Sequence, residues 1–102
     1  MDQIKRIQTM EEIMEKSEAT LELLHIALVN YEEIKQDLQA LEDYYHSDLW
    51  RKDYRDDECG KLPKDLKRGV LSEDGIWDLL SEKDYLYMKM KQLYEEEKSL
   101  YE

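Results

Sequence analysis

The chain has 102 residues, of which 41% are hydrophobic and 40% charged, and its 26 acidic and 15 basic residues give a formal net charge of -11. This length allows one domain at most, and the charge argues against direct binding to nucleic acid or to a membrane unless basic residues gather in one patch. The single cysteine, Cys59, excludes an internal disulfide framework. With no signal peptide and no apolar run long enough to span a bilayer, we expect a soluble cytoplasmic protein.

The first half of the chain has apolar residues at helical spacing. They form two series with a seven-residue period: Ile7, Met14, Leu21 and Leu28, and Met10, Leu24, Tyr31, Leu38 and Tyr45. This pattern predicts one long amphipathic helix over about residues 3–46. Beyond Asn30 the apolar positions move one residue earlier, which predicts a bend or a change of packing partner there.

Every strong helix breaker lies between residues 60 and 75. Before this stretch, Ser47 can cap a short helix over residues 48–58, and Gly60 suits the left-handed position that follows such a helix. Pro63 is well placed to begin another short helix over residues 63–68, which Gly69 would stop. These elements predict a compact connector.

The last segment supplies a second long helix. Ser72 is a good N-cap, and the apolar residues that follow recur at helical spacing: Ile76, Leu79, Leu80, Leu86, Met90, Leu93 and Leu100. We expect a helix over about residues 72–101 that packs antiparallel on the first. The whole chain, residues 1–102, is therefore predicted to be a single all-α domain: an antiparallel hairpin of two long amphipathic helices with a short-helix connector.

The first predicted helix outruns the last by about 20 Å at 1.5 Å per residue. Its apolar stripe must then be met by the connector or pair across a homodimer, and we expect a homodimer.

Two pairs of carboxylate and imidazole lie one helical turn apart, Glu22 with His25 and Asp43 with His46. Carboxylate-bridged di-metal bundles use this spacing twice. Here the two histidines would lie about 31 Å apart along one unbroken helix, so they cannot share a site unless the helix folds back or a second chain contributes. We therefore expect no metal, no cofactor and no enzyme activity, since no nucleophile with a base partner and no phosphate-binding glycine loop is present either.

The aromatic residues are eight tyrosines and two tryptophans, with no phenylalanine, so nearly all the large aromatic area carries a polar group. Tyrosine, tryptophan and arginine are the residue types enriched at binding hot spots. Several residues of these kinds, with lysines and the predicted cap, gather around the connector and form the candidate site for a partner or an anion: Trp50, Tyr54, Lys64, Lys67, Arg68, Ser72 and Trp77.

The connector contains the run Leu-Pro-x-Asp-Leu-Lys-Arg-Gly-Val-Leu-Ser-Glu-Asp, from Leu62 to Asp74. In this run, and in its place between a long acidic helix and a shorter one, the chain resembles a bacterial domain-of-unknown-function family, number 4298. The resemblance implies an all-helical bacterial protein and implies nothing about activity.

Two accounts of this motif are open. In the structural account, Leu66, Val70 and Leu71 plug the end of the hairpin, the basic pair faces the carbonyls of its own turn, and Ser72 caps the last helix. In the functional account, Lys67, Arg68 and that helix start accept a carboxylate or phosphate from a partner.

The function predicted from the sequence is a non-enzymatic protein–protein interaction module with a protein partner. The alternatives are an acidic decoy that mimics nucleic acid, or a helical protein that binds a small ligand or a metal.

Overall fold

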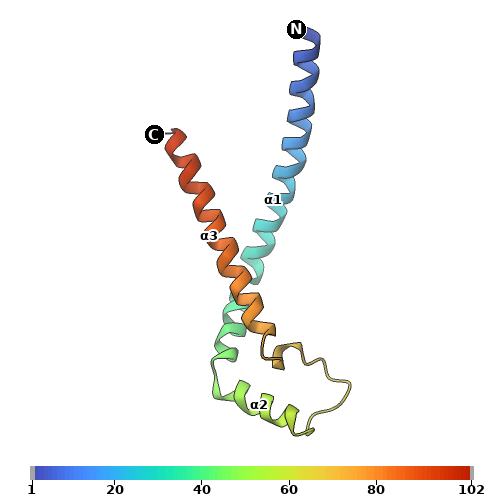
Figure 1. Cartoon of the computed structure of the whole chain (residues 1–102), viewed down its shortest axis with the longest axis vertical. Coiled ribbons are helices and arrows are strands. Elements are labelled where there is room, and N and C mark those ends of the chain that lie inside the picture. The colour runs from blue at the N-terminus through green and yellow to red at the C-terminus, as the bar shows by residue number, and fades with distance from the viewer. Residues whose placement is uncertain (1, 102) are drawn as a thin grey trace. The chain divides into compact units, whose positions relative to one another are not determined.

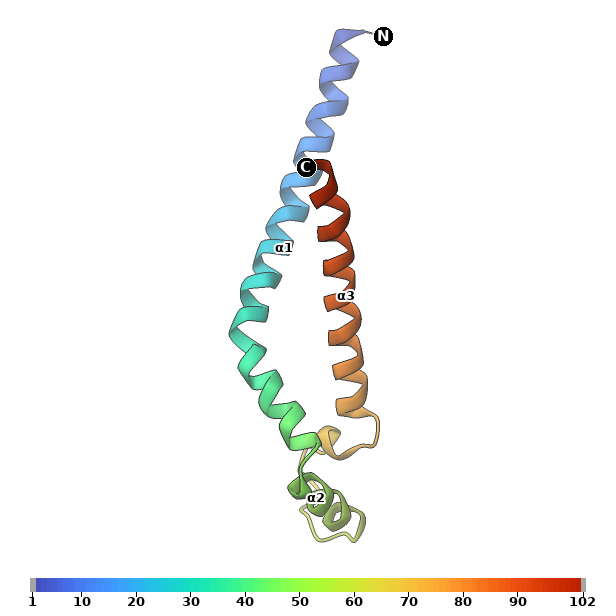
Figure 2. The ribbon, with the colours of Figure 1, turned by 90° about the vertical axis from the view of Figure 1, so that its left-hand side faces the viewer.

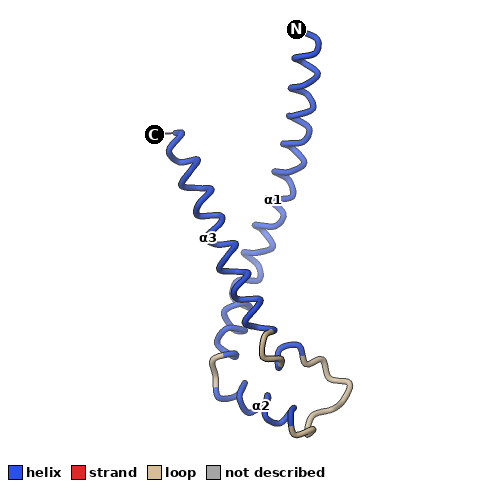
Figure 3. Tube along the Cα trace, viewed as in Figure 1, coloured by secondary structure: helices blue, strands red, loops and turns tan. Residues whose placement is uncertain are grey.

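The computed structural model describes residues 2–101 and places helices in four segments. They are α1 (Gln3–Tyr45), α2 (Asp48–Glu58), the short 3-10 helix η1 (Gly69–Leu71) and α3 (Gly75–Tyr101), shown in Figure 1. Figure 3 shows that the rest of the described chain is loop, without a strand. The predicted all-α class, with two long helices and a short-helix connector, is confirmed.

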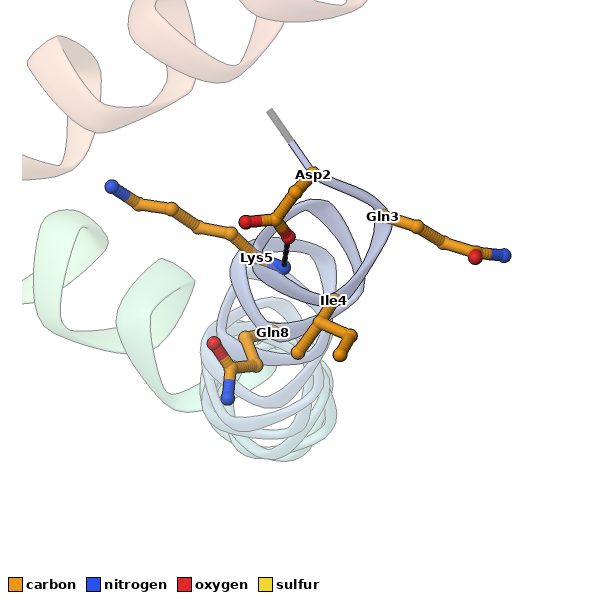
Figure 4. A pocket seen from close by; sticks show the side chains of 5 residues that line it. All are labelled: Asp2, Gln3, Ile4, Lys5 and Gln8. Carbon is orange, nitrogen blue, oxygen red and sulfur yellow. Dashed lines mark hydrogen bonds between the residues drawn. The ribbon is translucent and has the colours of Figure 1, made fainter.

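The chain divides into two compact units, one ending at Leu38 and the other beginning at Gln39. In the first unit α1 continues through Asn30 without a break, and the bend expected there stays a prediction. The helix begins where the Asp2 carboxylate accepts a hydrogen bond from the backbone N–H of Lys5 at 3.0 Å, drawn in Figure 4. This is an N-cap three residues before the satisfied donor.

The second unit is built around two buried side chains, Leu71 at 6% exposure and Ile76 at 2%. One belongs to η1 and the other to the first turn of α3, and η1 contacts both α2 and α3. Figure 2 shows the loop that leads from α2 to η1 and on into α3. Lys83 of α3 pairs with Glu42, near the end of α1, at 3.8 Å. The small core therefore sits where the connector meets the start of α3.

The predicted helix over residues 63–68 is wrong. That stretch makes a single turn, in which the Leu66 N–H donates to the Pro63 carbonyl at 3.3 Å, and the helical segment follows later as η1. The Arg68 guanidinium donates to the carbonyls of Pro63 and Leu66, and so satisfies acceptors that a longer helix would have used. Residues 63–68 therefore form a turn that the Arg68 side chain stabilises, and not the predicted helix with its backbone hydrogen bonds.

The last helix begins at Gly75 rather than at residue 72. Its first helical bond runs from the Asp78 N–H to the Asp74 carbonyl at 2.8 Å. Ser72 caps from further away, because its Oγ accepts a hydrogen bond from the Gly75 N–H at 3.0 Å. The predicted residue does bond to the helix start, but the helix is shorter than predicted.

Among the described helices, none combines the length and the apolar character that crossing a membrane requires.

Candidate functional site

The two ends of α2 are capped as the sequence predicts. The Ser47 Oγ accepts from the Trp50 N–H at 3.3 Å and donates to the Tyr44 carbonyl at 2.6 Å. At the other end Gly60 has φ of +73°, and the N–H groups of Gly60 and Lys61 donate to the carbonyls of Asp57 and Asp56. That pair of bonds is the Schellman arrangement, which needs a left-handed residue. These caps fix which side chains α2 turns toward the connector.

Three aromatic side chains make a continuous row, which we call the aromatic row: Tyr45, Trp50 and Tyr54. The ring centroids of Tyr45 and Trp50 lie 5.1 Å apart in an edge-to-face arrangement, and those of Trp50 and Tyr54 lie 5.2 Å apart, stacked at 24°. Positions 50 and 54 are one helical turn apart, so α2 itself brings these two rings together. Of the aromatic residues predicted to gather around the connector, Trp50 and Tyr54 stack on each other, whereas Trp77 contacts none of these rings and is 59% exposed.

Two residues of the aromatic row, Trp50 and Tyr54, donate hydrogen bonds to the part of the connector that follows α2. The Trp50 indole N–H donates to the Val70 carbonyl at 2.8 Å, and the Tyr54 hydroxyl donates to the Glu73 carboxylate at 2.8 Å. Hydrogen bonds to the carboxylates of Glu73 and Glu58 raise the pKa of Tyr54 above its ordinary value. Both contacts join residues about twenty positions apart, so they close the connector onto α2.

A hydrogen bond between another tyrosine hydroxyl and a carboxylate joins Tyr44, in the last turn of α1, to α2. Its hydroxyl donates to the Asp53 carboxylate at 2.6 Å. Burial and this hydrogen bond raise the pKa of Tyr44 to about 12. The phenol therefore stays protonated as a donor well above neutral pH.

Arg68 is the most engaged side chain of the connector. Its guanidinium pairs with the Asp57 carboxylate of α2 and donates to the Pro63 carbonyl at 2.6 Å and to the Leu66 carbonyl at 3.3 Å. An ionised donor makes hydrogen bonds about twice as strong as neutral ones. The anion that pairs with the Arg68 guanidinium is therefore the Asp57 carboxylate of the same chain.

The predicted site residues fall into two groups. Four of them make internal contacts: Trp50, Tyr54, Arg68 and Ser72. Three are exposed, and the described residues offer them no hydrogen bond, ion pair or ring contact: Lys64, Lys67 and Trp77. The residues that sequence analysis missed are the acceptors Asp57, Val70 and Glu73, because no local pattern marks a carboxylate or a carbonyl as the partner of a distant side chain.

Of the three apolar residues predicted to plug the connector, Leu71 alone is buried. Leu66 is 45% exposed and Val70 43%. Nothing in the stretch from residue 2 to residue 101 places three or more histidine, cysteine or acidic side chains to hold a metal ion. A hollow at the start of α1 is lined by neighbours on that single helix, among them Asp2, Ile4 and Gln8, and Figure 4 shows their side chains on its surface.

The largest exposed apolar feature of the first unit lies along α1. Six side chains of the two seven-residue series are between 44% and 63% exposed, and we call them the α1 seam: Ile7, Met10, Met14, Leu21, Leu24 and Leu28. The sequence predicts the periodicity of this face correctly. The first unit itself, a single helix, has nothing that could cover it.

Comparison with known proteins places most of the chain in one family. Neither the curated proteins nor the solved structures contain a significant match. A family model described as a domain of unknown function, DUF4298, matches residues 7–93, a range that includes the α1 seam, α2, the connector and most of α3. The family suspected from the connector motif is therefore confirmed, and the chain belongs to the DUF4298 family.

Proposed function

We propose that the chain is a non-enzymatic protein–protein interaction module, and that its docking surface is the α1 seam. The observation that carries the proposal is the exposure of this seam, in which all six apolar side chains are at least 44% exposed. Apolar side chains gathered on one exposed face mark interaction sites on soluble proteins. Its seven-residue period suits the side-chain spacing of another amphipathic helix, so the partner we propose offers a helix.

The connector has a supporting part in this proposal. Trp50 and Arg68 fold the connector onto α2, so they are poor candidates for direct contact with a partner. Lys64, Lys67 and Trp77 are free to add contacts at that end of the molecule. The acidic-decoy alternative rests on net charge alone.

The proposal is tested by capture from a native bacterial lysate with three baits. The first is the wild-type chain. The second carries Leu21→Glu and Leu28→Glu, which place two charges in the seam. The third carries Ala19→Glu and Asn30→Glu, which add the same charges to exposed positions of α1 outside the seam.

We expect a protein that is retained by the wild type and by the control but lost with the seam variant. Circular dichroism of the three purified baits is the folding control, and we expect equal helicity in all three. A partner retained equally by all three would refute the seam as the docking surface. Loss of that partner only when Lys64, Lys67 and Trp77 are changed would move the surface to the connector.

A further inference from the structure

We propose that the helix that covers the α1 seam is α1 of a second copy of this chain, in a parallel two-stranded pair over residues 7–28. The inference rests on the proposed function, because it names the partner of the same surface. The seam has the pattern that such pairing requires. Ile7, Met14, Leu21 and Leu28 take the first apolar position of successive heptads, and Met10 and Leu24 take the second.

The first heptads of α1 carry exposed apolar side chains. Ile7, Met10, Met14 and Leu21 are each more than half exposed. A second copy of α1 offers a surface of the same length and the same spacing. The paired stretch of 22 residues spans about three heptads, which is the shortest length at which this pattern is typical of a coiled coil.

The charges beside the seam favour a parallel pair. In a parallel pair, the residue just before the first apolar position of a heptad faces the residue five positions later on the other helix. Arg6 of one copy then meets Glu11 of the other, an attractive pair, and no like charges face each other along the seam. An antiparallel pair sets the acidic edges side by side, so that Glu18 lies next to Glu18 or Glu11 of the second copy. That placement is repulsive.

The one polar position within the seam favours the same orientation and sets the register. Ser17 occupies an apolar position of the heptad pattern and is exposed. In a parallel pair in register it meets Ser17 of the second copy, and the two hydroxyls can bond to each other. In the antiparallel registers that overlap most of the seam it faces Leu21 or Met14 instead, which leaves a hydroxyl unsatisfied in an apolar layer.

The test uses the purified 102-residue chain with Cys59→Ser, which removes its single cysteine. In this background Met10→Cys places one thiol in each seam. Parallel pairing brings the two thiols face to face, whereas the antiparallel registers separate them by at least 11 residues, about 16 Å, too far for a disulfide. Ala19→Cys is the matched control, because it lies on α1 outside the seam.

We expect mild oxidation to cross-link the Met10→Cys chain into a dimer and to leave the Ala19→Cys chain uncross-linked. Sedimentation equilibrium of the unmodified protein at about 100 μM should give twice the mass of the 12.4 kDa chain, and Leu21→Glu should weaken the association at least tenfold. A monomer at this concentration overturns the proposal, as does a dimer that does not cross-link through Met10→Cys. If the monomer nevertheless captures a lysate partner through the seam, self-pairing is wrong and the proposed interaction module stands.

Discussion

Of the three glycines, Gly75 is the one at which an added Cβ would meet neighbouring atoms. A Cβ built there would lie 2.4 Å from the Gly69 carbonyl oxygen and 2.6 Å from the Ser72 Oγ. The carbonyl would have to move by about 0.6 Å to restore a 3.0 Å contact. That oxygen also accepts hydrogen bonds from the Ser72 N–H at 3.2 Å and from the Ser72 Oγ at 2.9 Å.

Gly75→Ala is therefore expected to destabilise the second unit. Overpacking of this kind costs about 1–3 kcal/mol, and each hydrogen bond that is strained adds up to about 1 kcal/mol. The gain in helix propensity offsets at most about 1 kcal/mol. The net expectation is a loss of about 1–3 kcal/mol, or a Tm lower by about 4–8 °C for each kcal/mol.

Gly69→Ala is the matched control. No atom lies within 4 Å of a Cβ at that position, and its φ is outside the left-handed region. We expect it to be neutral or to stabilise by about 0.5 kcal/mol, because alanine restricts the unfolded chain. Urea unfolding followed by tryptophan fluorescence compares the two variants. If Gly75→Ala unfolds at the same urea concentration as Gly69→Ala or at a higher one, the close approach does not exist.

Three further predictions concern the contacts around α2. Trp50→Phe removes the indole hydrogen bond to the connector and should lower the free energy of unfolding by urea by about 1 kcal/mol. The control Trp77→Phe, at an exposed ring, should change it by less than about 0.5 kcal/mol. Equal losses in the two variants would contradict the Trp50 contact. Arg68→Ala leaves the half-buried Asp57 carboxylate of α2 without its partner and should lower the free energy of unfolding by about 1–3 kcal/mol. The control Lys67→Ala, at an exposed side chain, should be nearly neutral. An Arg68→Ala variant as stable as the wild type would show that the guanidinium does not hold the connector. The pKa of Tyr44 is raised to about 12 in the folded state, against the ordinary value of 10 in the unfolded chain, so its contribution to stability is full below pH 10 and is lost between pH 10 and 12. Tyr44→Phe should flatten the pH dependence of the unfolding free energy in that range. An unchanged slope would refute the assignment.

The roles of the connector residues also decide how binding experiments are designed. Reversing the charge of Arg68 would put a carboxylate beside Asp57, so loss of binding in such a variant would report loss of folding. Lys64→Glu with Lys67→Glu probes the same surface without touching an internal contact. This pair is the sharper test of whether the connector contacts a partner.

Local sequence signals predict the three α-helices and most of their ends. Periodic apolar residues, the Ser47 cap and the left-handed Gly60 are local signals, and α1 and α2 end within one residue of where these signals predict. The connector motif also indicated the family, which the family model confirms over residues 7–93. Local structure can be predicted this well because each cap or turn depends on residues within about four positions of it.

The fold of the connector, by contrast, depends on contacts between residues that are far apart in the sequence. The predicted helix over residues 63–68 gave way to a turn and η1 because Arg68 bonds to the carbonyls there and to Asp57, eleven residues earlier. The internal hydrogen bonds of Trp50 and Tyr54 were not predicted because their acceptors lie about twenty residues away in the sequence. Such partners follow from chain reversal, which no local pattern encodes. Burial was decided in the same way: apolar residues follow the full length of α1 and α3, yet among residues 2–101 only Leu71 and Ile76 lie where three elements converge closely enough to exclude water.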